Sequence, residues 1–136
     1  MTRAEFQQQV IDTIAGVSQV KDVVVNYIPP PSKVKVFPTV AVDFPETDFE
    51  RGVGKSFNIY DNIHLYIYTR SSRTNKYEDS INNLVEVISQ ELLTNITLNS
   101  NVLDIYVSKV KTDGGVSYPI IINRLEVKSH YISECI

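Results

Sequence analysis

Residues 57–68 show the clearest pattern in the sequence, a regular alternation of aliphatic and polar side chains. Because successive side chains of a β-strand point to opposite faces of its sheet, this pattern predicts a long strand with one aliphatic face. The opposite face carries three tyrosines, Tyr60, Tyr66 and Tyr68. Asp61 interrupts the aliphatic parity once, which predicts a bulge or a bend near it. The aliphatic face of the sheet therefore needs helices to cover it. The second face is half apolar and needs a cover of a different kind.

Two segments have the period of amphipathic helices. The first begins with the capping-box spacing of Thr2 and Glu5 and is expected to end at Gly16. The second runs from Asn75 to about Asn95 and is the longer of the two. Their apolar stripes are formed by Phe6, Val10 and Ile14 in the first helix and by Ile81, Leu84, Val85, Ile88 and Leu92 in the second.

Four further segments have the composition of strands. They are residues 23–27, 40–44, 102–111 and 118–132, of which the third carries Leu103, Ile105 and Val107 on one predicted face. The run Pro29-Pro30-Pro31 ends the first strand, since proline has no amide hydrogen to donate. Asp113-Gly114-Gly115 predicts a hairpin turn between the last two strands, because glycine accepts the positive φ that such turns require. The polar segment 45–55 is expected to be a loop.

The expected element order is α-β-β-β-α-β-β. It lacks the strand–helix–strand rhythm of a parallel sheet. We therefore predict an α+β fold with a mostly antiparallel sheet and two main helices packed on one face. The 136 residues suit a single domain spanning 1–136, which needs no metal or disulfide to fold.

Composition and charge limit the partners. The formal net charge of −3 is too small and of the wrong sign for a general nucleic-acid binder. No apolar run approaches the roughly 20 residues that span a bilayer, so no membrane partner is expected. Cys135 is the only cysteine and the first residues lack the apolar core of a signal peptide, so we expect the chain to stay in a cytoplasm.

Enzyme motifs are missing from the sequence. His64 and His130 lie in predicted strands, and His64 could meet Asp61 or Asp104 across a sheet, but no spacing requires it. No Cys/His set for zinc and no phosphate-binding glycine loop is present. The carboxylates Asp43, Glu46, Asp48 and Glu50 are interpreted as a solvated loop or as an electrostatic docking surface. We expect no catalytic, cofactor-binding or metal site, and no enzymatic activity.

The tyrosines of the long strand leave two interpretations open. Tyr60, Tyr66 and Tyr68 can pack under the second helix of their own chain. Alternatively they lie at a subunit interface, where aromatic residues with a polar tip are enriched. Arg70 and Arg73, just past the strand, would then suit its polar rim.

The order of elements resembles one family over nearly the whole chain. A capped N-terminal helix leads to a short strand and to Tyr27-Ile28-Pro29-Pro30-Pro31, and two strands flank the acidic segment 45–55. The long strand, the helix 75–95 and the hairpin at Asp113-Gly114-Gly115 follow. This arrangement resembles the tail-terminator, or tail-completion, proteins of long-tailed bacteriophages.

The resemblance implies a virion structural protein of the tail or neck, assembled in the host cytoplasm. Such proteins form hexameric rings that cap the tail tube, stop its polymerisation and join it to the head-side connector. The implied partners are further copies of the chain, the tail tube protein and the head-completion or connector protein, with DNA only passing through a lumen. Phe49 and Arg51, in the segment 45–55, would reach toward a neighbouring ring.

Two alternatives remain at this point. The chain could be another head–tail joining or neck protein of similar size. It could also be a small ligand-binding module or enzyme with a cleft near His64 and Asp104, which predicts a monomer or a dimer.

Overall fold

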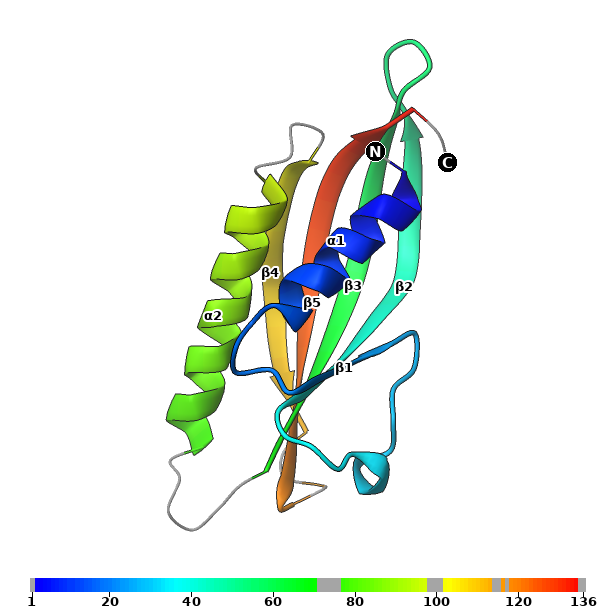
Figure 1. Ribbon diagram of the computed structural model, residues 1–136. Coiled ribbons are helices and arrows are strands. Elements are labelled where there is room, and N and C mark those ends of the chain that lie inside the picture. Colours follow the sequence, from blue (N-terminus) through cyan, green and yellow to red (C-terminus); the bar gives the residue numbers. More distant parts are fainter. Residues whose placement is uncertain (1, 71–76, 98–101, 114–115, 117, 135–136) are drawn as a thin grey trace.

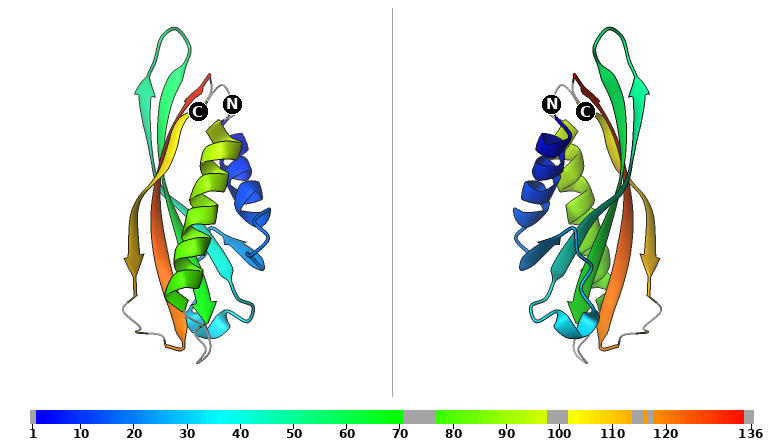
Figure 2. Two further views of the ribbon diagram at one scale, coloured as in Figure 1. Left: turned by 90° about the vertical axis from the view of Figure 1, so that its left-hand side faces the viewer. Right: turned by 90° about the vertical axis from the view of Figure 1, so that its right-hand side faces the viewer.

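The computed structural model describes residues 2–70, 77–97, 102–113, 116 and 118–134, without the side chains of 77–82 and 97. Five strands form one sheet in the order β1-β2-β3-β5-β4, and every neighbouring pair is antiparallel except β1 and β2. Both α-helices cover the same face of this sheet (Figure 1, Figure 2). The elements are α1 (Arg3–Ala15), β1 (Asp22–Val25), the 3-10 helix η1 (Pro31–Lys33), β2 (Thr39–Arg51), β3 (Phe57–Arg70), α2 (Tyr77–Thr97), β4 (Val102–Thr112) and β5 (Ile120–Ser133). The predicted α+β class and element order are confirmed.

The helices lie where the sequence periods place them. The Thr2 hydroxyl accepts a hydrogen bond from the Glu5 amide at 3.1 Å, which satisfies one free donor at the start of α1. The predicted start of α2 at Asn75 and the side chain of Ile81 lie outside the described residues. The buried helix side chains are Phe6, Val10 and Ile14 of α1 and Leu84, Ile88, Leu92 and Ile96 of α2.

The aliphatic side of β3 faces the helices and supplies the centre of the core. Ile63, Leu65 and Ile67 have no exposed surface. Burying one such side chain contributes about 1.5–3 kcal/mol, so this strand holds both helices on the sheet.

Strand β2 is much longer than predicted. The expected loop 45–55 is wrong for its first part, because β2 continues to Arg51 and only residues 52–56 form the turn. The register slips between Asp43 and Glu46, so Phe44 and Pro45 together oppose a single residue, Ile63. A bulge was predicted near Asp61 of β3, and the bulge found lies instead on the neighbouring strand β2. Pro45 has no amide hydrogen and is tolerated at such a position.

Asp61 itself is buried on the helix side of the sheet, with 2% of its surface exposed. Its carboxylate accepts hydrogen bonds from the hydroxyls of Tyr131, at 3.0 Å, and Thr47. The Arg3 side chain donates to the Thr47 hydroxyl at 3.2 Å, and the Phe6 ring stacks on Tyr131 with centroids 4.1 Å apart. The start of α1 is therefore fixed on the sheet by one polar cluster and one aromatic pair.

Strand β4 departs from simple alternation. Its pairing with β5 slips between Val102 and Asp104, and Leu103 is 52% exposed. The predicted common face of Leu103 with Ile105 and Val107 is therefore wrong for Leu103, because the slip turns its side chain out of the core. The predicted hairpin joins β4 to β5, and its glycines Gly114 and Gly115 lie outside the described residues.

Candidate functional site

The sheet face opposite the two α-helices, called the outer face below, has neither of them over it (Figure 2). Only the part around Tyr68 is covered, by the segment that contains η1. In β3 the outer face is formed by every second residue, and the cross-strand partners of these residues on β2, β5 and β4 belong to the same face. The β3 members are Asn58, Tyr60, Asn62, His64, Tyr66 and Tyr68. The predicted tyrosine-rich face is thus real, and the predicted alternative of a cover by the second helix is wrong because α2 packs on the other side.

Tyr60 lies in the open part of the outer face and is 39% exposed. Its ring stacks on that of His130 with centroids 4.3 Å apart, and His130 Nε2 lies 2.9 Å from the Asn58 amide oxygen. These contacts hold both rings in place before any partner arrives. A rigid aromatic side chain loses little entropy on binding, which suits a contact surface.

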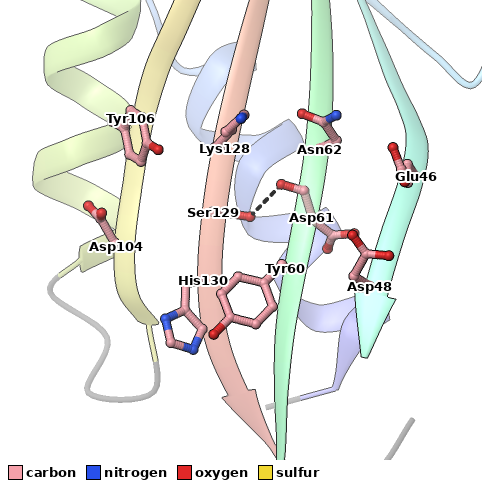
Figure 3. Close-up of a pocket in the computed structure, with 10 residues that line it drawn as sticks. All are labelled: Glu46, Asp48, Tyr60, Asp61, Asn62, Asp104, Tyr106, Lys128, Ser129 and His130. Atoms are coloured by element: carbon pink, nitrogen blue, oxygen red, sulfur yellow. Dashed lines mark hydrogen bonds between the residues drawn. The ribbon is translucent and has the colours of Figure 1, made fainter. Parts of the chain in front are cut away.

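A hollow of about 540 Å³ surrounds this aromatic pair (Figure 3). It crosses four strands of the sheet. Its lining is polar, with four carboxylates among ten residues, and is formed by Glu46, Asp48, Tyr60, Asp61, Asn62, Asp104, Tyr106, Lys128, Ser129 and His130. Asp104 is the register partner of His130, so the predicted cleft between His64 and Asp104 is not formed.

His64 lies farther along the outer face, opposite Glu126. Its Nε2 is 3.9 Å from the Glu126 carboxylate, which Arg124 also contacts at 3.0 Å. Asp61 points to the helix side, so its predicted meeting with His64 does not occur. The His64 contacts suit a polar surface cluster that can bind through charge and hydrogen bonds.

Tyr68 is not available to a neighbouring subunit. Only 1% of its surface is exposed, and its hydroxyl donates to the Pro29 carbonyl at 2.7 Å. Burial, with the nearby Tyr66 and Tyr27, raises the pKa of Tyr68. The interface role predicted for Tyr68 is therefore corrected: the segment 29–34 of the same chain covers it, and Val34 and Ala41 pack beside it.

The other predicted interface residues have different surroundings. Tyr66 is half-buried beside Tyr68, and Arg70 is exposed at the end of β3. Phe49, 43% exposed, and Arg51 lie on the protruding end of β2, on the side of the sheet that carries α1. Arg73 lies outside the described residues. Tyr60 and Tyr66 share one surface, whereas Phe49 and Arg51 belong to another.

Charge on the outer face is distributed unevenly, and the sequence analysis missed this. Glu46, Asp48 and Glu50 of β2, called the acidic row, pair with outer-face residues of β3 and are exposed. Lys109 and Lys111 of β4, called the basic row, pair with outer-face residues of β5 and are also exposed. In the sequence, the charges of each row already recur at every second residue, as they do on one face of a strand. The acidic segment was nevertheless interpreted as a loop.

The described residues hold neither a metal-binding cluster nor a helix suited to crossing a membrane. There, no three potential ligands among His, Cys, Asp and Glu come together as a metal site. Over the same part of the chain, neither helix combines the length and the apolar character that a bilayer crossing requires.

Comparisons with known proteins show a likeness of fold to solved structures. No family model matches the sequence, and no curated protein matches it. Among solved structures, the fold is similar to that of a chain described as "Virion of native gene transfer agent (GTA) particle", with a TM-score of 0.52 and 10% identity. The match covers 94% of this chain and 92% of that one. At this identity the likeness establishes a shared fold.

Proposed function

We propose that this protein is a structural component of a phage-like virion. The observation that carries the proposal is the fold shared, over nearly the full length of both chains, with a chain from a virion particle. A virion component works by contacting its neighbours, and the exposed part of the outer face around Tyr60 offers a surface for such contacts.

Within the virion, the proposed role is that of a tail terminator. Copies of the chain form a hexameric ring that caps the tail tube, stops its growth and joins it to the head connector. The element order that resembles this family is the one that the structure has, which supports the role. DNA passes through the lumen of such a ring without being recognised, which agrees with the net charge of −3.

The proposed contacts divide between two surfaces. Tyr60 and Tyr66 of the outer face, with Arg70 at its rim, contact neighbouring copies in the ring. Arg73, which lies outside the described residues, is proposed to join the same contact. Phe49 and Arg51, near the tip of the β2–β3 hairpin, extend toward the next ring of the tube (Figure 1). The proposal gives these residues contact roles and no catalytic role, so the protein is proposed not to be an enzyme.

The proposal is tested by measuring molar mass with light scattering after size exclusion, followed by electron microscopy alone and with tail tubes from the same particle. The expected result is a species near six times the 15.4 kDa of one chain, ring-shaped, or chains that assemble only at one end of the tubes. Binding to the head-side connector but not to tubes would favour another joining protein instead. A monomer or dimer that binds neither the tubes nor the connector would refute the proposal.

A further inference from the structure

Within the described residues, the sheet has two stretches of strand whose outer side is not paired with another strand. Strand β1 pairs with Thr39–Val42 only, so the end of β2 from Glu46 to Arg51 has an open edge. Strand β4 is the last strand at the opposite side and is open along its outer edge. Open edges present unpaired amides and carbonyls and can accept a further strand.

The two open edges carry opposite charges on the same face. The acidic row is spaced at every second residue of β2, and the basic row has the same spacing on β4. The two ion pairs found among the described residues both belong to Glu126, so neither row is neutralised by an ion pair there. Each row is therefore available to charges of the opposite sign from outside the subunit.

We propose that the acidic row of one copy pairs with the basic row of the next, with the open end of β2 against the outer edge of β4. This inference rests on the proposed function, because it names the contact by which copies join. The contact uses two different patches, so it is heterologous and repeats head to tail around a ring.

The strand directions fit this contact. Three antiparallel steps separate β2 from β4 in the sheet, so the two strands run in opposite directions. Copies set side by side in the same orientation would then pair β2 with β4 as antiparallel strands. The rows are not level across the sheet, because the register aligns Glu46 with Tyr106 and Lys109 with Asp43. The next copy must therefore be displaced along the strands by about five residues, roughly 17 Å, for the two rows to face each other. Both rows would then lie on one continuous face, where opposite charges on neighbouring strands attract.

The same charges act against the symmetric alternatives. A two-fold contact through β2 alone would bring carboxylates against carboxylates, and one through β4 alone would bring lysines against lysines. Like charges placed directly opposite one another are destabilising. The pattern therefore favours a head-to-tail chain of copies over a two-fold dimer.

The test exchanges the signs of the two rows. Variant A is Glu46→Lys/Asp48→Lys, which gives the acidic row two lysines and leaves Glu50 as its one carboxylate. Variant B is Lys109→Glu/Lys111→Glu, which makes both rows acidic. Each variant alone should associate about tenfold or more weakly than the native chain, measured by sedimentation in low-salt buffer. An equimolar mixture of A and B should recover association, because each basic row then meets an acidic one.

Matched controls separate the rows from net charge. Lys33→Glu/Lys35→Glu changes the charge as variant B does, at exposed positions in and beside η1. Glu86→Lys/Glu91→Lys does the same for variant A, at exposed positions on α2. Both controls should associate like the native chain, and circular dichroism should show all four variants folded.

Two outcomes would overturn the inference while leaving the proposed function standing. In the first, the native chain forms rings, and variants A and B form them equally well. In the second, the native chain stays monomeric in low salt but still caps tail tubes. Loss of association in A and B without recovery in the mixture would also overturn the pairing of the two rows.

Discussion

Removal of the Tyr131 hydroxyl tests whether the cluster around Asp61 holds the first helix on the sheet. In the variant Tyr131→Phe the ring remains, so its stack on Phe6 and the surrounding packing are kept. What is lost is one hydrogen bond of 3.0 Å to a carboxylate that is 2% exposed. A hydrogen bond to a charged group contributes about 1.5–3 kcal/mol, and we expect the free energy of unfolding to fall by that amount.

The assay is equilibrium unfolding in urea, followed by circular dichroism at one fixed protein concentration because association shifts apparent stability. With an m-value of about 2 kcal/mol/M, the midpoint should fall by about 1 M urea. The control Tyr60→Phe removes a hydroxyl from an exposed ring and should change stability by less than about 0.5 kcal/mol. Equal midpoints for Tyr131→Phe and the native chain would refute the reasoning.

A double variant sharpens this test. Thr47 donates the second hydroxyl hydrogen bond to the same carboxylate. In Tyr131→Phe/Thr47→Val the buried Asp61 loses both hydroxyl donors, so the combined loss should exceed the sum of the two single losses. Strict additivity would show that the two hydroxyls act independently.

The remaining predictions concern the two buried tyrosines. Burial and the adjacent Asp61 raise the pKa of Tyr131, and burial raises the pKa of Tyr68, so the unfolded chain loses these protons first as the pH rises past about 10. Stability should therefore be full below that pH and fall above it. For Tyr131 the fall should be about 1.4 kcal/mol per pH unit, and Tyr131→Phe should remove that increment from the slope. Equal alkaline slopes would contradict this assignment. Tyr68→Phe loses the bond to the Pro29 carbonyl and should cost about 1 kcal/mol in urea unfolding without changing the association mass, and a changed mass would restore Tyr68 to the interface.

The parts of the fold that follow from local periods were predictable. The stripe of α2 and the aliphatic side of β3 repeat within a few residues, so each element identifies its own buried face. The end of β2 was not predictable in the same way, because Glu46–Arg51 follows Pro45 and has a single apolar residue, Phe49, which shows no alternation. An edge strand that buries neither face has no hydrophobic signal to distinguish it from a loop.

The candidate surface depended on contacts between distant segments. Tyr60 and Tyr68 have the same parity in β3, yet the first is exposed and the second is covered by residues 29–34. The alternation of side chains in β3 does not indicate that residues 29–34 pass over Tyr68. Leu103 is similar, since its outward turn follows from a slip in pairing with β5 rather than from its own neighbours in sequence.

The open edges connect the stability of the subunit to its assembly. A long unpaired edge invites uncontrolled pairing, and charged side chains are one way in which proteins limit it. Here β1 covers the first part of β2, so the open edge shrinks to Glu46–Arg51, and the charges on it repel a second copy of itself. The edge of β4 carries the complementary charge. A surface that only resisted pairing would need one sign on both edges; opposite signs on the two edges instead select one neighbour in one orientation, as closure of a ring requires.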